Sequence, residues 1–333
     1  MVLDEIEDNI ALHNKVVAFV DDDALKIKKV FSKYLIEGPI SDIDAIIKKY
    51  KAEEVIIAIA DLDEKRLFEI VQYMKDSNVR IRRLPLFKEL DKNSPRKVID
   101  VNINELLSRS PIELANGDIH DFIHGKTVLV TGAGGSIGSE LVKQIFAQHP
   151  KVLVLFDIYE NGVYDVQQTL VRKMRRDNIT DIQLFTLIGS TYNEVRMEQI
   201  FKKYRPDLVF HAAAYKHVPL MEDSPVEAIR TNVIGTYNVA RLADKYGVKK
   251  MVLVSTDKAV RPTNVMGATK RFAEMIIQYF AEKSSHTAYS AVRFGNVLGS
   301  NGSVIPLFQK QIAEGWPVTV TSREMTRFFM TIP

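Results

Sequence analysis

Cysteine is missing from this 333-residue chain, and tryptophan occurs only once. Without cysteine the protein can form no disulfide, no thiolate zinc site and no cysteine nucleophile. We therefore expect no metal site of this kind, and we look for chemistry in the remaining polar side chains.

Long apolar runs are missing as well. Runs such as Val55–Ala60 (VIIAIA) fall far short of the ~20 residues that cross a bilayer. The first ten residues, MVLDEIEDNI, are acidic and lack the apolar centre of a signal peptide. These features predict a soluble, cytoplasmic chain.

The chain also lacks an excess of charge of one sign. Its 45 lysines and arginines nearly balance 42 aspartates and glutamates, which leaves a net charge of +3. No basic stripe with interleaved aromatic residues stands out, so we expect no nucleic-acid partner. A hydrophobic content of 46% is that of an ordinary globular protein, and the length favours two domains.

Residues 1–90 alternate between strand-like and helix-like patterns. Lys15–Val20 is rich in β-branched residues, and the apolar run Val55–Ala60 suits a strand buried on both faces. Ser41–Tyr50 begins with a capping serine and places isoleucines on one helical face. Further elements are expected as a helix over 63–75 and a strand over 79–85. The pattern predicts a partial Rossmann-like α/β domain with a mostly parallel sheet. It contains no glycine-rich loop, so we assign it no cofactor and favour a docking or regulatory role.

Residues 91–123 are polar and include two prolines, which predicts a linker with short ordered pieces. The catalytic domain is expected over 124–333. It begins with a strand at Thr127–Val130, followed by glycines at 132, 135 and 138 and a helix from about Ser136. Glycine at this spacing permits a tight turn and close approach of a pyrophosphate to the helix N-terminus. The strand–loop–helix context makes the glycine triplet a dinucleotide-binding signal, with Gly132, Gly135, Ser136, Ile137 and Gly138 as cofactor contacts.

The next strand, over 151–157, ends in Asp157. A carboxylate at this place can accept both hydroxyls of an adenosine ribose and would repel a 2′-phosphate. No arginine follows directly, so we predict NAD as the cofactor; the alternative is that Asp157 only caps the next helix. Further strands are expected over 182–189, 208–214, 250–256 and 289–297. Small side chains at Ala212, Ala213 and Ala214 would let the cofactor lie across one strand end. The fold class is thus α/β, with an NAD-binding Rossmann fold.

The segment Ser255–Arg271 (STDKAVRPTNVMGATKR) has a serine after a strand and a lysine, Lys270, on the following helix. Four residues before that lysine, where a proton-transferring tyrosine is expected, stands Met266. A thioether carries no proton, so Met266 either shapes the pocket or packs in the core. Thr256, Asp257 and Lys258 follow a central strand, where open α/β sheets bind ligands, and an acid beside a lysine can move protons.

With these residues in place, the chain resembles the extended short-chain dehydrogenases/reductases that act on nucleotide sugars. Within them it is similar to the CapD-like UDP-N-acetylglucosamine 4,6-dehydratases, and Met266 is typical of the branch that retains the configuration at C5. The resemblance rests on TGAGGSIGSEL, HAAAYKHVPLMEDSPVEAIRTNVIGTYNV, STDKAVRPTNVMGATKR, RFGNVLGSNGSVIPLF and EMTRFFMTIP, and covers residues 126–333.

The resemblance implies dehydration of UDP-N-acetylglucosamine to UDP-2-acetamido-2,6-dideoxy-α-D-xylo-hexos-4-ulose, with NAD regenerated in each turnover. Asp257 would assist loss of the C6 hydroxyl, Lys258 would be the base at C5, and Thr256 would hydrogen-bond the 4-hydroxyl. The group that takes the 4-hydroxyl proton is left open. The remaining implied contacts fall into two sets. On the cofactor side they are Ser190, Asn232, Ser255 and Lys270, and on the substrate side Lys216, His217, Asn296, Ser303 and Arg327.

Two departures from the family pattern are expected to matter. Relatives begin with transmembrane helices and a complete first βα unit, and they continue beyond residue 333. We therefore expect the intact protein to lie at the cytoplasmic face of the inner membrane. Helical pairing in this superfamily also implies a homo-oligomer. The alternatives are a C5-inverting dehydratase, a UDP-sugar 4-epimerase, and a nucleotide-binding scaffold that has lost catalysis.

Overall fold

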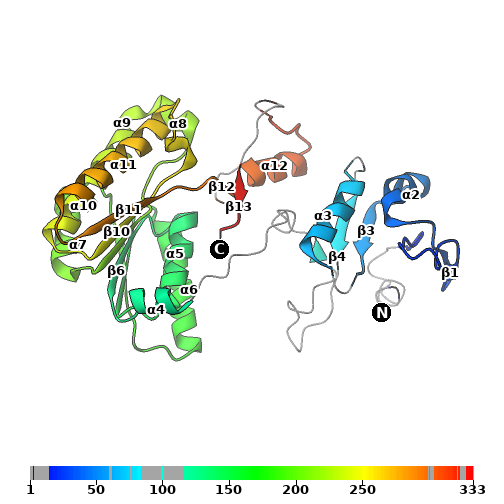
Figure 1. The fold of residues 1–333 in the computed structure, drawn as a ribbon, viewed down its shortest axis with the longest axis horizontal. Helices are drawn as coiled ribbons and strands as arrows, with labels where there is room; N and C mark the ends of the chain where they lie inside the picture. The colour runs from blue at the N-terminus through cyan, green and yellow to red at the C-terminus, as the bar shows by residue number, and fades with distance from the viewer. Residues whose placement is uncertain are drawn as a thin grey trace. The chain divides into compact units, whose positions relative to one another are not determined.

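The computed structural model describes residues 3, 15–59, 62–75, 77, 79–83, 99–100, 116–298, 300, 304–320, 322 and 328–332. The chain divides into two compact units, residues 1–112 and 113–333, which are shown in Figure 1 and described separately here.

The first unit is built around a three-stranded sheet, on which two helices among its described residues pack. The strands are β3 (Glu54–Ile57), β4 (Arg80–Arg83) and β5 (Ile99–Asp100), in the order β3-β4-β5. β3 and β4 are parallel, whereas β4 and β5 are antiparallel. A 3₁₀ turn, η2 (Ile40–Asp42), leads into α2 (Ile43–Tyr50), and α3 (Glu64–Tyr73) joins β3 to β4. Both helices bury apolar side chains against the sheet, among them Ile43, Ile47, Leu67, Ile70 and Met74.

Two local predictions in this unit are wrong. Residues 15–20 form no strand. Only Phe19 makes a bridge, to Ile36, because it exchanges backbone hydrogen bonds with Leu35, at the end of the β1–β2 hairpin (Val30–Phe31 and Tyr34–Leu35), and with Glu37. Ser41 does not cap the helix, because it lies inside the 3₁₀ turn and donates its hydroxyl to Asp42 Oδ1 at 3.1 Å.

The second unit contains a parallel sheet of six strands in the order β11-β10-β9-β6-β7-β8. The strands are β6 (Thr127–Thr131), β7 (Val152–Asp157), β8 (Gln183–Ile188), β9 (Leu208–His211), β10 (Lys250–Val254) and β11 (Ala288–Val292). The first strand of the unit, β6, thus lies between β7 and β9. This is the doubly wound order of a Rossmann fold, and it creates a switch point where the chain runs outward in opposite directions.

Successive residues of the central strands point to opposite faces of the sheet, and both faces are covered by helices (Figure 1). Val128 and Val130 pack with α4 (Asn116–Ile123), α5 (Ser136–Phe146) and α6 (Glu160–Arg176). Leu129, between them, packs with α7 (Glu194–Tyr204), α10 (Thr236–Lys245) and α11 (Val265–Lys283). Such burial on both faces explains the nearly continuous apolar runs of these strands.

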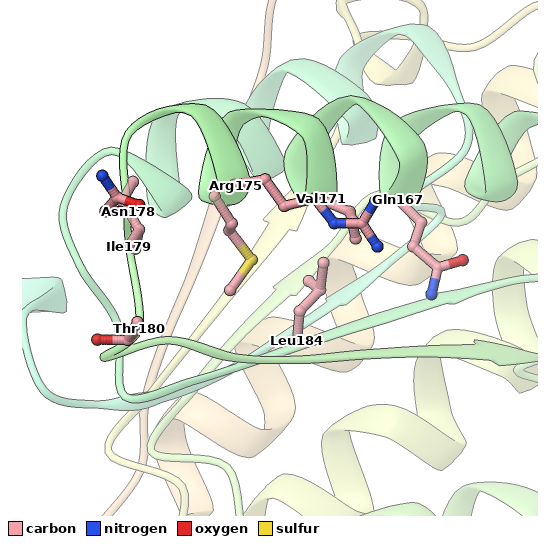
Figure 2. A pocket seen from close by; sticks show the side chains of 8 residues that line it. Gln167, Val171, Arg175, Asn178, Ile179, Thr180 and Leu184 are labelled. Atoms are coloured by element: carbon pink, nitrogen blue, oxygen red, sulfur yellow. The ribbon is translucent and has the colours of Figure 1, made fainter.

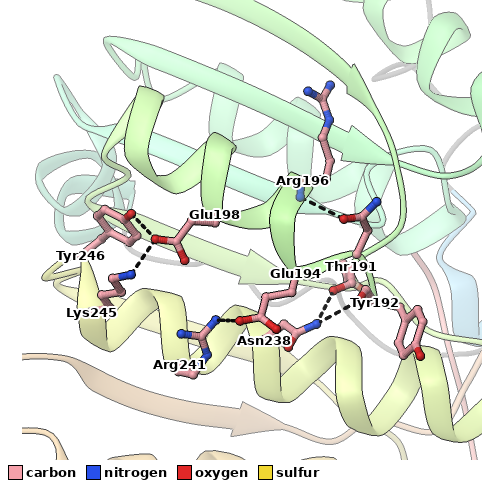
Figure 3. Close-up of polar contacts among 10 residues, drawn as sticks. Thr191, Tyr192, Glu194, Arg196, Glu198, Asn238, Arg241, Lys245 and Tyr246 are labelled. Atoms are coloured by element: carbon pink, nitrogen blue, oxygen red, sulfur yellow. Dashed lines mark hydrogen bonds and ion pairs between the residues drawn. The ribbon is translucent and has the colours of Figure 1, made fainter.

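Helices α7 and α10 are also joined by polar contacts along their exposed sides, as Figure 3 shows. Arg241 donates to Glu194 at 2.6 Å, and Lys245 donates to Glu198 at 2.7 Å. Exposed pairs of this kind contribute only about 0–1 kcal/mol each, so the apolar core between the helices and the sheet carries most of the packing energy.

Shorter elements complete the unit. They are α8 (Val218–Asp223), α9 (Pro225–Ala228), the π-helix η5 (Ile229–Gly235), the 3₁₀ turn η6 (Asp257–Ala259), α12 (Val304–Ala313) and the parallel pair β12 (Asn296–Val297) and β13 (Phe329–Met330). The strand predicted over 289–297 is therefore two strands. After β11 the chain stays beside the segment that follows β10, since the backbone N–H groups of Ser255 and Asp257 donate to the carbonyls of Val292 and Phe294, and it then pairs with β13 as β12.

The predicted strand over 208–214 also ends early, at His211, so that Ala212–Ala214 form a loop. Within the predicted linker, α4 occupies 116–123, while residues 91–98 and 101–115 lie outside the described residues; the domain limits stay a prediction. In the part of the chain that the structure describes, no helix combines the length and the apolar character needed to span a membrane.

Candidate functional site

The loops that follow β6 and β9 meet at the switch point of the sheet. Gly132 has a φ of 72°, which favours glycine. A Cβ on this residue would lie 2.4 Å from the backbone nitrogen of Ala213. The glycine loop and the alanine loop therefore touch backbone to backbone, and the contact of a cofactor with this strand end stays a prediction.

The glycine loop leads directly into α5. A Cβ on Gly138 would lie 1.9 Å from the carbonyl oxygen of Gly132, so the first turn of the helix can approach the loop only with glycine there. Gly135 is the N-cap residue, and no described side chain caps this helix start. The positive end of the helix dipole lies at this helix start, near Ser136 and Ile137, where an anion is stabilised.

Asp157, at the carboxyl end of β7, is buried, and its carboxylate links the glycine loop to the loop between β7 and α6. Its Oδ2 accepts the backbone N–H of Gly134 at 2.7 Å, and its Oδ1 accepts that of Tyr159 at 2.9 Å. It does not cap α6, whose N-cap residue is Tyr159. Gly134, which was not among the predicted contacts, also has no room for a side chain, because a Cβ there would lie 2.7 Å from the backbone nitrogen of Val163.

Ser190 follows β8 at the same edge of the sheet, where its Oγ accepts the backbone N–H of Tyr192 at 3.2 Å. The loop is held from the other side by Asn238 of α10, whose amide donates to the carbonyls of Thr191 and Tyr192 at 3.1 Å each (Figure 3). Ser190 therefore lies on a fixed loop, next to the carboxyl end of β7, where Asp157 lies.

A buried histidine joins the two central strands. His211, the last residue of β9, pairs in register with Thr131 of β6. Thr236 donates its hydroxyl to the carbonyl of Asn232 at 2.7 Å, so it accepts from His211 Nε2 at 3.0 Å, and Nδ1 is left to accept from Thr131 at 2.6 Å. Burial, with the nearby charge of Lys270, lowers the pKa of His211 to about 3. The ring is therefore a neutral structural brace.

Asn232 is fully buried in the π-helix η5. Its Oδ1 accepts the backbone N–H of Tyr215 at 2.9 Å, and its Nδ2 donates to the carbonyl of Tyr215 and to Thr269 Oγ1 at 3.0 Å each. These bonds hold the loop after β9 against α11. Asn232 thus supports the loop that borders the site. A direct contact with a cofactor stays a prediction.

The structure brings Thr256, Asp257, Lys258 and Asn296 into one cluster. Lys258 Nζ lies 3.3 Å from Asp257 Oδ1 and 3.2 Å from Asn296 Oδ1. Thr256 donates its hydroxyl to the same Asp257 oxygen at 3.0 Å. The side chains of Asp257 and Lys258 are 39% and 33% exposed, so both can reach a bound molecule. An acid and an amine in contact form a pair that can give and take protons.

Lys216 and His217 lie on the loop after the alanines. The pKa of Lys216 is lowered by burial and by the charge of Lys258, and the pKa of His217 is lowered by burial and by the charge of Lys216. Lys216 follows β9 and Lys258 follows β10, so both lie beyond the carboxyl ends of neighbouring parallel strands. The remaining two predicted contacts, Ser303 and Arg327, lie outside the described residues.

Helix α11 carries both Met266 and Lys270. Met266 is buried in a small apolar cluster with Met221 of α8 and Ala228 of α9, which supports the packing alternative for this residue. Lys270 is 5% exposed and donates to the carbonyl of Val254 at 2.8 Å, at the end of β10. Burial lowers the pKa of Lys270 to about 8, although Glu274 opposes the shift.

Ser255 was predicted to contact the cofactor, but its hydroxyl is donated to Glu274 Oε1 at 2.6 Å. Glu274 itself was missed by the sequence argument. Its signal was present: it stands four residues after Lys270 on an otherwise apolar face of α11.

A cavity of about 570 Å³ lies elsewhere in the unit, between α6 and the edge strand β8 (Figure 2). Its lining includes Val171, Met174, Arg175 and Leu184, from the end of the helix and the start of the strand. It thus opens by the amino end of β8, whereas the glycine loop and the Asp257–Lys258 pair follow the carboxyl ends of strands. Ligands of open α/β sheets bind at the carboxyl ends, so this cavity is not the candidate site.

Comparisons with known proteins agree with this arrangement. A family model described as polysaccharide biosynthesis protein matches residues 128–333, and one described as CoA-binding domain matches residues 2–85. The capsular polysaccharide biosynthesis protein CapD of Staphylococcus aureus is 46% identical over 323 residues, which cover 95% of this chain and 53% of that protein. The chain therefore spans about half the length of this relative.

Two further proteins are similar to a part of the chain. The UDP-glucose 4-epimerase of Rickettsia canadensis is 38% identical over 209 residues, which cover 62% of this chain and 59% of that protein. The X-ray structure of Pen from Bacillus thuringiensis is 41% identical, with a TM-score of 0.56, and the match covers 63% of this chain and 65% of that chain. Together with the family model, these matches show that the chain belongs to the polysaccharide biosynthesis protein family, in its CapD-like group of extended short-chain dehydrogenases/reductases.

Proposed function

We propose that the protein is a nucleotide-sugar dehydratase that binds NAD and converts UDP-N-acetylglucosamine to UDP-2-acetamido-2,6-dideoxy-α-D-xylo-hexos-4-ulose with retention at C5. The fit to NAD rests on the glycine loop. Gly132 and Gly138 leave no room for a Cβ, and the uncapped start of α5 faces the space where a pyrophosphate would lie. Asp157 would accept the ribose hydroxyls with the oxygen lone pairs that its two backbone bonds leave over.

When bound, NAD would supply the acceptor and donor of hydride. The protein's own contribution is the movement of protons around the sugar. Lys258, as the free amine, would remove the proton at C5. Asp257, as the acid, would protonate the C6 hydroxyl as it leaves as water. Thr256 would hydrogen-bond the 4-hydroxyl, and Lys270 would hold the cofactor's ribose.

The observation that carries the proposal is the contact of Lys258 with both Asp257 and Asn296 at 3.2–3.3 Å. A 4-epimerase needs a single proton exchange at the 4-hydroxyl and has no use for an acid–base pair directed at C5 and C6. The relatives that carry the name UDP-glucose 4-epimerase make epimerisation the second candidate. A chain that had lost catalysis would have no reason to keep the pair.

The decisive experiment is to incubate the intact protein with UDP-N-acetylglucosamine in deuterated water and to follow the sugar by NMR. Dehydration gives a 4-keto-6-deoxy product with deuterium at C5 and the original configuration there. A C4 epimer with hydrogen kept at C5 would assign the chain to the second candidate. An inverted C5 would place it in the other dehydratase branch, and bound NAD without any change in the sugar would favour a scaffold.

A further inference from the structure

Glu274 is a buried carboxylate whose hydrogen bonds all come from neighbouring side chains. Oε1 accepts from Ser255 Oγ at 2.6 Å and from Arg293 Nε at 2.7 Å. Oε2 accepts from Arg293 Nη2 at 2.6 Å and from Arg271 Nη1 at 3.1 Å. Burial alone would raise the pKa of Glu274, but the bonds from Arg293, Ser255 and Arg271 outweigh it and bring the pKa to about 2. The group is therefore a permanent anion.

Two of these partners stand directly beside the proton-moving turn. Ser255 immediately precedes Thr256, so its bond to Glu274 fixes the chain that enters the turn. Arg293 immediately precedes Phe294, whose carbonyl accepts the backbone N–H of Asp257 at 3.0 Å. The same segment continues to Asn296, which accepts from Lys258 Nζ at 3.2 Å. One carboxylate thus holds the two segments that flank the Asp257–Lys258 pair.

The helix that carries Glu274 adds a third connection. Lys270 lies one turn earlier on α11 and donates to the carbonyl of Val254, the residue before Ser255. Gly267, near the start of α11, lets the helix approach the turn itself, because a Cβ there would lie 2.4 Å from the carbonyl oxygen of Lys258. Helix α11 is therefore fixed both to the end of β10, through Lys270, and to the turn itself, through Gly267.

We propose that Glu274 is a positioning residue, which sets the place of Asp257 and Lys258 by holding Ser255 and Arg293 together. The inference rests on the proposed function for the roles of the pair, but the clamp itself is independent of which sugar is bound. Because a misplacement of about 1 Å in a reacting group can cost about 100-fold in rate, the clamp would act on turnover more than on binding.

The test compares Glu274→Gln with Arg293→Lys in the intact protein carrying NAD, with Glu282→Gln as a matched control on the exposed side of the same helix. We expect kcat to fall roughly 10- to 100-fold in Glu274→Gln, while KM for the nucleotide sugar changes less than about threefold. Arg293→Lys keeps the positive charge but loses the bidentate contact with Glu274. Its kcat should therefore fall less than that of Glu274→Gln, while KM again stays unchanged. Glu282→Gln should change neither constant.

A second readout does not depend on activity. Hydrogen exchange of the Asp257 amide, which bonds to Phe294, should become at least about 10-fold faster in Glu274→Gln and stay unchanged in Glu282→Gln. If the wild type epimerises instead of dehydrating, the proposed function fails, while the exchange rate and the kcat–KM split on epimerisation still test Glu274. An unchanged kcat, a rise in KM alone, or unchanged exchange at Asp257 would each overturn the positioning role. If Glu274→Gln does not fold, the same criteria apply to Arg293→Lys.

Discussion

The two halves of the candidate site are built in different ways. Around the glycine loop, the geometry comes from side chains that are missing: Gly132, Gly134 and Gly138 each lie where a Cβ would meet backbone atoms. Around the Asp257–Lys258 pair, the geometry comes from polar side chains that hold one another, and Glu274 bonds to the neighbouring Ser255 and Arg293. The first half is a rigid cradle made of backbone, and the second is a network of polar contacts.

This difference predicts how each half fails. A side chain added to the cradle collides with backbone, which cannot move aside at low cost, so both stability and cofactor binding should suffer. A side chain removed from the polar network leaves the sheet and its core in place, so the protein should stay folded and lose rate instead. Three substitutions test the contrast.

The largest effect is expected for Lys258→Ala. Loss of the base at C5 should lower turnover by about 100- to 10,000-fold, because that is the usual contribution of a positioned acid or base. Affinity for NAD should stay within about twofold and the melting temperature should hardly move, since Lys258 is one-third exposed and pairs only at the rim of the site. Steady-state kinetics, calorimetry with NAD and thermal unfolding measure the three quantities.

The matched control is Lys245→Ala, which removes a half-exposed lysine that likewise contacts a carboxylate, Glu198, far along α10 (Figure 3). Its turnover should equal that of the wild type. Retention of turnover in Lys258→Ala would show that the proton at C5 is moved by a different group.

A smaller but still large effect is expected for Gly138→Ala, in the cradle. The new Cβ would lie 1.9 Å from the carbonyl oxygen of Gly132 and would push α5 away from the loop. Overpacking of this kind typically costs about 1–3 kcal/mol of unfolding free energy, and binding of NAD should be lost with it. Denaturant unfolding and calorimetry check both, with Gly117→Ala in α4, where nothing lies within 4 Å, as the control. Equal stability in the two variants would contradict the steric account of the cradle.

The cradle is also the half that the sequence predicted best. Missing side chains are visible in a sequence as glycine and alanine, and the strand–glycine–helix order fixes where they lie in space. The six parallel strands were likewise expected, because runs buried on both faces have a distinctive apolar pattern. The strand ends were less well predicted, since residues 296–297 pair with β13, a partner that lies far along the sequence and that no local pattern reveals.

The polar network could be predicted only in part. Thr256, Asp257 and Lys258 were found because they follow a strand directly, where position alone suggests a role. Glu274 and Arg293 were missed, because their contacts join residues 19 positions apart in the sequence and depend on how α11 packs on the sheet. Asn232 and Ser255 were placed near the cofactor, while their hydrogen bonds go to protein partners that no local pattern reveals.

The smallest effect is expected for His211, which joins β6 to β9 beneath the glycine and alanine loops. Its pKa is about 3 in the folded protein, against an ordinary value of 6.5, so between these values the unfolded chain binds one proton more than the folded one. Stability therefore rises with pH in this window and is lost as the pH falls. One such group contributes a slope of about 1.4 kcal/mol per pH unit.

Replacing His211 by glutamine removes the group that binds this extra proton in the unfolded chain. In His211→Gln, the free energy of unfolding between about pH 4 and 6 should fall less steeply with decreasing pH, by close to one proton's slope. His286→Gln, at an exposed histidine beside Asp244, is the control for the substitution itself. The slope is the informative quantity, because a loss of hydrogen bonds to Thr131 and Thr236 lowers stability equally at every pH. An unaltered slope in His211→Gln would mean that the ring already takes up a proton in the folded protein, and the brace between the two strands would then be a charged one.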